Sequence, residues 1–498
     1  MKKYFPTLWL VFKVLAGIAA ALAVLILLAS LVLSIYGSRE LNAVRAEAAA
    51  RGVPLSMKEL MARRPVIPED GNAANLYEAA FSLLPAGNGR TEEPVPMVSS
   101  VIHLSDGRMT AAQKAIHDDL NRVLTNRCEA IPEYILEATR KYVDGRRAAI
   151  DLICKAATFR KCSYHVDWLN DMEGFSRLYG PMRQVGWFMS LAAWLDAEEG
   201  RAADAAAKIR ATIALGSSLT DEPNIAFSVW NRSATLNATV GGLMRVVSRA
   251  NISNDDLLIL QKDLERFAAE TPVRNPLEID LATMCDQYAA ALESRTGLYS
   301  VLFGYGLPSG MTTDRKTSVA LYSFVWLLRG AVRLDEAAMI KCYLAFLDNP
   351  GDPGTASMKA ADEVAAIIGE TWRFPARKLP STVHSDIRVW SLIVPRAEGA
   401  AAALAALRCR NNTGKWPETL DALLPEYIQK VPVELFTNQP LAYTVLPDGI
   451  IVYSRGKNGV DDGGKPWLVE PAANDPNRDY YDDVGFRIQE TVEQRKNE

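Results

Sequence analysis

Residues 14–36 read VLAGIAAALAVLILLASLVLSIY, and this stretch determines how the rest of the chain is placed. It contains no charged side chain, and Ser30 and Ser34 are its only polar side chains before the closing Tyr36. As a helix it would span roughly 35 Å at about 1.5 Å per residue, which is enough to cross a hydrocarbon core of about 30 Å. We therefore expect residues 1–37 to form an N-terminal membrane anchor.

A cleaved secretory signal is the alternative interpretation of this stretch. The apolar region of such a signal usually runs about 7–15 residues and ends in a cleavage site of small residues. Residues 14–36 form a longer run that ends in Ile-Tyr-Gly-Ser-Arg. This favours a transmembrane helix retained as a signal-anchor.

Basic residues on both sides of the anchor bear on its orientation. They are Lys2, Lys3 and Lys13 before it and Arg39, Arg45 and Arg51 after it. Cytoplasmic flanks usually carry the excess of Lys and Arg, and the short N-terminal flank adds its own α-amino charge. We expect a single-pass protein of the cell membrane with a cytoplasmic N-terminus and an extracytoplasmic body.

One other apolar run needs to be considered as a span. Residues 318–328 read SVALYSFVWLL and stop at Arg329. The run is too short to cross a bilayer and is better suited to a buried core helix.

Composition limits the remaining function classes. The chain has 498 residues, 49% of them hydrophobic and 23% charged, which is ordinary for a folded body of two to three domains or one helical array. Its net charge is −4 and it has no long basic run. We expect no nucleic-acid partner.

The six cysteines form no C-x-x-C pair. Cys154 and Cys162 would lie roughly 12 Å apart along a helix axis, whereas the Cα atoms of a disulfide lie about 4.4–6.8 Å apart. We expect mostly buried free thiols, although disulfides between helices remain open.

From residue 110 to 395 the pattern is helical, with apolar stripes at helical spacing. Four tryptophans of this region are expected in the core: Trp187, Trp194, Trp230 and Trp326. Residues 191–215, LAAWLDAEEGRAADAAAKIRATIAL, resemble a tetratricopeptide helix pair with its turn at Gly200. The 34-residue period does not recur. Repeat-like stacked helix pairs and an irregular bundle therefore both remain open.

No catalytic motif stands out. His165, Asp167 and Asp171 lie at i, i+2 and i+6, whereas ligands on one helix face lie at i and i+3 or i+4, so we expect no metal there. The chain has no G-x-S-x-G, P-loop or H-E-x-x-H motif and no G-x-G-x-x-G after a strand. We assign no catalytic or cofactor-binding residue, and a role other than catalysis is favoured.

The pattern changes in residues 396–498. Residues 396–410 form an alanine-rich helix, and residues 441–446 and 450–454 read as two strands joined through Pro447-Asp448-Gly449, which is a hairpin signal. We therefore divide the chain into an anchor (1–37), an α-helical body (38–395) and a small α+β module (396–498). The predicted fold class is mainly α.

This module resembles the C-terminal region of the major pseudopilins of type II secretion systems. The motifs that carry the resemblance are Trp416-Pro417, Phe436, Pro440-Leu441-Ala442-Tyr443, Val452-Tyr453-Ser454-Arg455-Gly456 and Asn458-Gly459-Val460-Asp461-Asp462-Gly463-Gly464. Residues 14–36 lack the glutamate of a prepilin, and about 360 residues separate them from the module, so the chain is not a pilin subunit. As a whole it is similar to membrane-anchored bacterial proteins of unknown function that have a helical body.

The resemblance implies a calcium site in the loop that follows the hairpin. Asp461 and Asp462 match the loop aspartates, and Asp482 or Asp483 matches the acid after the loop. Residues 461–483 carry seven acids against two bases, and calcium takes six to eight oxygen ligands. We assign Asp461, Asp462 and Asp483 to a structural calcium site; a solvated acidic loop without metal is the alternative.

Together these features predict a membrane-anchored envelope protein with a binding or assembly role, beside a secretion or pilus-like system and with an envelope protein as partner. Stacked helix pairs form concave surfaces suited to that role. An envelope hydrolase, whose carboxylates come together only on folding, is the alternative. The sequence does not indicate a small-molecule substrate.

Overall fold

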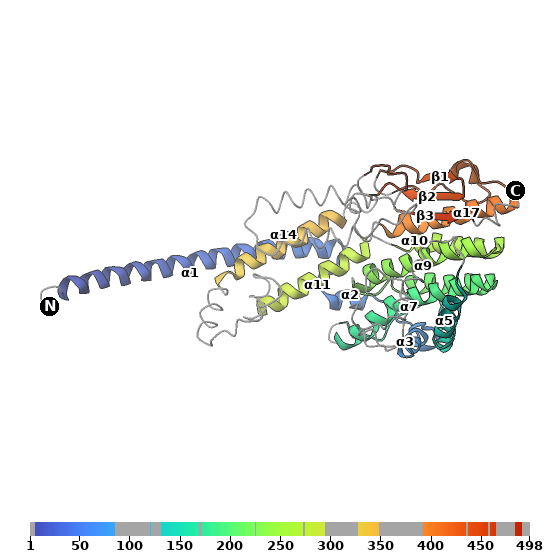
Figure 1. Cartoon of the computed structure of the whole chain (residues 1–498). Coiled ribbons are helices and arrows are strands. Elements are labelled where there is room, and N and C mark those ends of the chain that lie inside the picture. Colours follow the sequence, from blue (N-terminus) through green and yellow to red (C-terminus); the bar gives the residue numbers. More distant parts are fainter. Residues whose placement is uncertain are drawn as a thin grey trace. The chain divides into compact units, whose positions relative to one another are not determined.

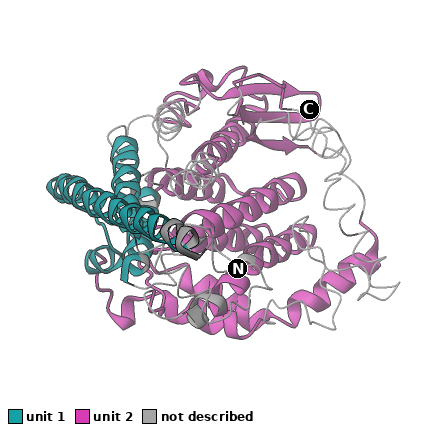
Figure 2. Ribbon diagram, turned by 90° about the vertical axis from the view of Figure 1, so that its left-hand side faces the viewer, with its two compact units in different colours: residues 1–63, 277–350, 356–384 teal, residues 64–276, 351–355, 385–498 magenta. Residues whose placement is uncertain are grey.

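The computed structural model describes residues 5–84, 120, 131–168, 172–224, 226–271, 274–293, 327–347, 392–434, 437–456, 459–464 and 484–490. This part of the chain is mainly helical and has one small antiparallel sheet, so the predicted fold class is confirmed. The chain divides into two compact units (Figure 2). Unit 1 comprises residues 1–63, 277–350 and 356–384, and unit 2 comprises residues 64–276, 351–355 and 385–498.

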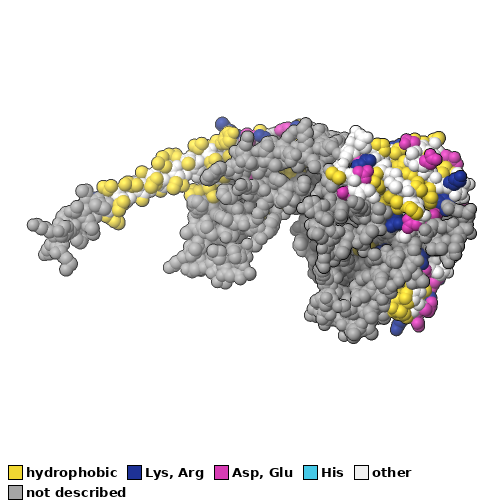
Figure 3. Space-filling view, turned by 45° about the horizontal axis from the view of Figure 1, so that its top comes forward, with side chains coloured by type: hydrophobic (Ala, Val, Ile, Leu, Met, Phe, Trp, Pro, Cys, Tyr) yellow, Lys and Arg dark blue, Asp and Glu magenta, His cyan; other side chains and the backbone are white. Residues whose placement is uncertain are grey.

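The helices of unit 1 are α1 (Phe5–Ala50), α2 (Met57–Ala62), most of α11 (Arg274–Glu293) and α14 (Arg329–Leu347) (Figure 1). Helix α1 contains the predicted anchor and continues without a break past Tyr36 to Ala50. Its anchor side chains are exposed, Leu25 by 62% and Val32 by 66%, and apolar atoms cover the visible part of the helix (Figure 3). By length and composition α1 is a candidate membrane-spanning helix, and a signal sequence would look the same.

The end of α1 packs closely against α14. Leu41, Val44 and Ala48 of α1 are buried at helical spacing. The two backbones meet at glycines: a Cβ atom on Gly330 would lie 2.4 Å from the carbonyl carbon of Leu33, and one on Gly37 would lie 2.4 Å from the carbonyl oxygen of Gly330. Only a residue without a side chain permits this approach.

Polar contacts fix the register of α1 and α14. Ser30 Oγ donates to the Leu327 carbonyl oxygen at 2.7 Å, and Arg333 donates to Ser34 Oγ and Ser38 Oγ at 3.0 and 2.8 Å. Further along, Arg45 pairs with Glu336 at 2.5 Å. The partners advance together along both helices, so α1 and α14 run parallel.

Unit 2 is built from helices, with a small sheet packed against α17 at one edge (Figure 1). Its helices are α3 (Ala74–Ser82), α5 (Glu133–Asp144), α6 (Arg147–Ala156), α7 (Met172–Glu198), α8 (Ala202–Ser217), the π-helical η2 (Ala226–Asn231), α9 (Arg232–Arg249), α10 (Asn254–Ala269), α17 (Ile393–Thr413) and the 3-10 turn η4 (Leu420–Leu423). Helices α7 and α8 form the predicted pair, and Gly200 closes their turn with a φ of +76°. Helix α9 packs against both α7 and α8, and α10 packs against α17 and α8.

Helix α17 lies between α10 and the sheet (Figure 1). Seven consecutive residues of α17, from Ala400 to Ala406, are at most 2% exposed. A helix that is covered on every face must have small side chains where its neighbours come close. The alanine-rich sequence meets that requirement and joins the sheet and the helix pairs in one hydrophobic core.

The sheet has the order β1–β2–β3, with β1 (Ala442–Leu446), β2 (Gly449–Ser454) and β3 (Val484–Gln489) all antiparallel. The predicted β1–β2 hairpin is confirmed, with Leu446 opposite Gly449. The third strand was not predicted, although Val484, Phe486 and Ile488 alternate toward the core. Gly449 has a φ of +141°, and a Cβ atom there would lie 2.1 Å from the Ile488 carbonyl oxygen of β3.

Glu434 ties the segment before β1 to the end of β2. Its side chain is 1% exposed and accepts hydrogen bonds from Ser454 Oγ at 2.8 Å and from the Arg455 backbone N–H at 2.7 Å. The Arg455 guanidinium and Thr437 Oγ1 also donate to it. These hydrogen bonds offset the free-energy cost of removing the carboxylate from water.

Some sequence predictions hold and others need correction. Trp194 is buried, but Trp230, which lies within the π-helical η2, is 41% exposed. Trp326 lies outside the described residues, as do Cys128 and nearly all of 318–328. The five described cysteines are free thiols, of which Cys285, Cys342 and Cys409 are buried.

The glycine contact between α1 and α14 generates a test. Gly330→Ala adds one methyl group where no space exists, so unit 1 should lose about 1–3 kcal/mol. Labelling of the buried thiols Cys285 and Cys342 by a thiol reagent, followed by mass spectrometry, should become several-fold faster. Gly17→Ala, whose Cβ atom would have nothing within 4 Å, is the matched control. Equal labelling rates in both variants would show that the close approach is not required.

Candidate functional site

A groove of about 1190 Å³ lies within unit 2. It is lined by α8 and α10, by the end of α6 with residues 157–163, by residues 64–67, and by two side chains of the α3 region. We call it the α8–α10 groove. It lies where α8 of the α7–α8 pair meets α10.

Small side chains leave room along α8. Ala207, Ala211 and Ala214 line the groove at i, i+4 and i+7, which places them on one helix face. Along α10 the lining runs from Ile259 to Glu270, a rise of about 16 Å. The hollow is therefore elongated along the helices.

The lining has a strong positive charge. Six cationic side chains line it, Arg64, Arg160, Lys161, Arg210, Lys262 and Arg266, against three acids, Asp221, Asp263 and Glu270. The local balance of +3 contrasts with −4 for the whole chain. An electrostatic contrast of this kind in a concave surface attracts anionic ligands.

Three of the six cations are already paired. Arg210 and Arg266 share Asp263, at 3.0 and 3.3 Å, and Arg64 pairs with Glu222 at 2.7 Å. In the described part of unit 2, no side chain pairs with Arg160, Lys161 or Lys262, and all three are exposed. A ligand would meet these three exposed cations together with the exposed acids Asp221 and Glu270.

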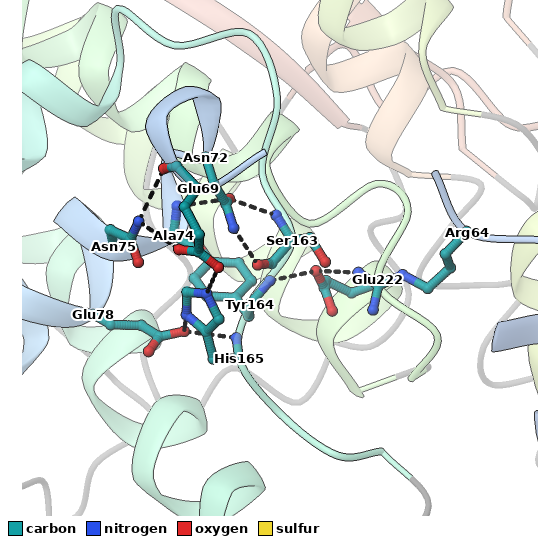
Figure 4. Close-up of polar contacts among 10 residues, drawn as sticks. All are labelled: Arg64, Glu69, Asn72, Ala74, Asn75, Glu78, Ser163, Tyr164, His165 and Glu222. Carbon is teal, nitrogen blue, oxygen red and sulfur yellow. Dashed lines mark hydrogen bonds and ion pairs between the residues drawn. The ribbon is translucent and has the colours of Figure 1, made fainter. Parts of the chain in front are cut away.

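A short backbone link fixes the segment that carries Arg160 and Lys161 (Figure 4). The Ala73 N–H donates to the Lys161 carbonyl oxygen at 3.0 Å. The amide of Asn72 donates to the Ser163 carbonyl oxygen at 2.9 Å, and its oxygen accepts from Ser163 N–H and Ala74 N–H at 3.0 and 3.1 Å. The side chain of Asn72 therefore contacts the first turn of α3 and also holds the groove wall.

Glu222 is a buried carboxylate directly behind this wall (Figure 4). Its Oε1 atom accepts from Arg64 Nη2 at 2.7 Å and from the Tyr164 backbone N–H at 3.2 Å, whereas the buried Oε2 atom has no hydrogen-bond partner. Burial raises the pKa of Glu222 to about 7, despite the opposing effect of Arg64 and the Tyr164 amide. The Arg64–Glu222 pair therefore joins the 64–67 segment to the groove wall.

His165 lies between two glutamates of the α3 region (Figure 4). Its Nδ1 atom lies 3.2 Å from Glu78 Oε1, and its Nε2 atom lies 3.4 Å from Glu69 Oε1. Asp167 and Asp171 lie close to His165 in the sequence, but the carboxylates next to its ring belong to Glu69 and Glu78. Across the described residues, no group of three or more His, Cys, Asp or Glu is arranged to hold a metal ion.

The two cysteines that line the groove are not activated nucleophiles. Burial raises the pKa of the Cys162 thiol far above its usual value, and it raises that of Cys154 as well. Tyr77, Phe81 and Tyr164 form an aromatic cluster next to them, with ring centroids 6.2–6.4 Å apart. A protonated thiol at the edge of an aromatic cluster suits packing, because only the thiolate is strongly nucleophilic.

The structure describes two of the three residues assigned to calcium. Asp461 Oδ1 accepts from Tyr453 OH at 2.8 Å and from Gly463 N–H at 2.9 Å, and its Oδ2 atom lies 3.4 Å from Arg455 Nε. Burial opposes ionisation of Asp461, but these contacts together lower the pKa of its carboxyl. Asp462 Oδ2 is buried without a partner, and Asp483 lies outside the described residues. The calcium site stays a prediction.

The groove and its charged residues are not predicted from the sequence. Arg160 and Lys161 are adjacent in the chain, but Lys262 is a hundred residues further on, and its helix looks like any amphipathic surface helix. Glu222 precedes Pro223 and reads as a helix start, with nothing local to show that it is buried. Only the packing of α8 against α10 brings these residues together.

Comparison with protein-family models, with curated protein sequences and with solved structures gives no match to this chain. The groove and the candidate anchor are therefore the features that bear on the function of this chain.

The buried carboxylate generates a prediction about pH. Because the pKa of Glu222 is raised on folding, the unfolded chain loses its proton first, near pH 4.5, and stability falls as pH rises toward about 7. Relative to Glu222→Gln, the wild type should lose about 3 kcal/mol of unfolding free energy between pH 4.5 and 8. Urea unfolding of the detergent-solubilised chain, followed by tryptophan fluorescence, measures this difference.

Glu418→Gln serves as the control for that measurement, because Glu418 is exposed. Its stability should follow the wild type at every pH. A Glu222→Gln curve parallel to the wild type would mean that Glu222 keeps an ordinary pKa.

Proposed function

We propose that this chain is a single-pass membrane protein of the cell envelope that binds a partner protein in the α8–α10 groove. Helix α1 spans the membrane with its N-terminus in the cytoplasm, and unit 2 and the part of unit 1 that follows the anchor lie outside the cytoplasm. The groove is the observation that carries the proposal: it is long, open, lined by small side chains, and positive on a chain of net charge −4.

The chemistry of the groove supports binding over hydrolysis. A glycosidase or a similar enzyme with two carboxylates needs them about 5–10 Å apart and facing one substrate. Of the three acids that line the groove, Asp263 is neutralised by Arg210 and Arg266, and Asp221 and Glu270 share the lining with the exposed cations; Glu222 is bonded to Arg64 behind the wall. The cysteines are not activated. These are features of a surface that holds a ligand.

The place of the protein beside a secretion or pilus-like system is supported by the resemblance of its C-terminal segment to pseudopilins. That segment cannot be deleted as a test of the role. Helix α17 and strands β2 and β3 share one core with α9 and α10, so removing residues 396–498 would expose that core. Single substitutions on the surface are the appropriate tests.

The proposed topology has a direct test. A protein with one tag on Met1 and another on Glu498 should stay in the membrane after alkaline extraction and carry both tags on one polypeptide. Protease added to spheroplasts should remove the C-terminal tag and spare the N-terminal one. Loss of the N-terminal tag during maturation would instead identify residues 14–36 as a cleaved signal.

Binding in the groove has a separate test. A photo-crosslinking amino acid at Ile259, which is 37% exposed in the groove, should give a discrete adduct with one membrane or envelope protein in cells. The same amino acid at Val445, which is 47% exposed on β1 outside the groove, should give none. No adduct at Ile259, or the same adducts at both positions, would contradict the proposal.

A further inference from the structure

We infer that the α8–α10 groove binds an acidic segment of its partner protein in an extended conformation, with the segment's carboxylates against Arg160, Lys161 and Lys262. The inference rests on the proposed binding role and specifies the chemistry of the ligand.

Charge complementarity is the first argument. Within the groove Asp263 is occupied by two arginines, and Arg64 is occupied by Glu222. Arg160, Lys161 and Lys262 remain exposed on the lining without a side-chain partner in the described part of unit 2. Unpaired cations grouped on a concave surface repel one another, and an acidic ligand relieves that repulsion.

The distribution of the cations favours an extended chain. Arg160 and Lys161 belong to the segment after α6, whereas Lys262 belongs to α10, so the charge is spread over two elements. Side chains of an extended peptide point alternately to opposite sides. A segment with several acids can therefore reach both elements at once.

The lining also offers acceptors for a peptide backbone. The hydroxyls of Thr158 and Thr220 donate to carbonyl oxygens three residues earlier, Lys155 and Ser217, at 2.8 Å each. Their lone pairs remain able to accept from the N–H groups of a bound peptide. The run of about 16 Å along α10 matches about five extended residues at about 3.3 Å each.

An anionic lipid headgroup fits less well. Its acyl chains would need a continuous apolar surface, but Ile259 is the only large apolar side chain in the described lining that is markedly exposed. The cations are also spread along the groove instead of converging on one phosphate. The polypeptide is therefore the occupant that the groove favours.

The experiment measures fluorescence anisotropy with the full chain in a neutral detergent. The probes are a fluorescein-labelled peptide of alternating glutamate and alanine, and the same peptide with glutamine in place of glutamate. The variant carries Arg160→Glu, Lys161→Glu and Lys262→Glu. The matched control carries Lys141→Glu, Lys415→Glu and Lys430→Glu, three exposed lysines outside the groove.

We expect the glutamate peptide to bind, and the glutamine peptide to bind at least tenfold more weakly. The groove variant should lose at least tenfold in affinity, and the control should stay within twofold of the wild type. Raising the salt from 0.05 to 0.5 M should weaken binding, because screening shortens the reach of exposed charges. If the charge-reversed variant does not fold, the three corresponding glutamine substitutions should still weaken binding severalfold.

Three results would overturn the inference. They are equal binding of the two peptides, equal binding by the groove variant and the wild type, and binding to phosphatidylglycerol vesicles, lost in the groove variant, with no binding of the glutamate peptide. The last result would assign the groove to a lipid surface. A crosslink at Ile259 without peptide binding would leave the binding role in place and remove only its acidic ligand.

Discussion

Unit 2 depends on the close packing of α17, a helix covered on all sides. Residues 400–406 can be buried all round because six of the seven are alanine, so α10 on one side and β2 and β3 on the other can come close to the helix backbone. A larger side chain would separate these layers and leave voids that a protein core does not tolerate. This constraint joins the last hundred residues of the chain to helices that are formed much earlier in the sequence.

The groove follows from that packing. With α10 held against α17, the α10 face that carries Lys262, Asp263 and Arg266 is placed beside α8. Alanines on α8 then leave a hollow instead of filling it. The wall segment after α6 is held by Asn72 and by the Ala73–Lys161 hydrogen bond, and the Arg64–Glu222 pair holds the segment before α3. Charged residues that are far apart in the sequence thus share one concave surface.

Unit 1 is organised by a different constraint, the close approach of two helix backbones. Gly37 and Gly330 allow the backbones of α1 and α14 to approach closely. Hydrogen bonds from Ser30 to the Leu327 carbonyl oxygen and from Arg333 to Ser34 connect the same two helices. The apolar helix therefore does not end as a loose tether. Beyond its exposed stretch, α1 packs against α14. An anchored α1 would therefore fix the orientation of α14.

The sequence by itself determined the elements whose signals are local. The apolar run of 14–36, the α7–α8 turn at Gly200 and the β1–β2 hairpin all depend on residues within a few positions of one another. Only the tertiary structure decided the third strand, the exposure of Trp230 and the groove. The strand pairs with a partner about 35 residues away, the tryptophan lies in a π-helical turn, and the groove cations come from four separate segments. Each depends on contacts between distant parts of the chain, which no local pattern encodes.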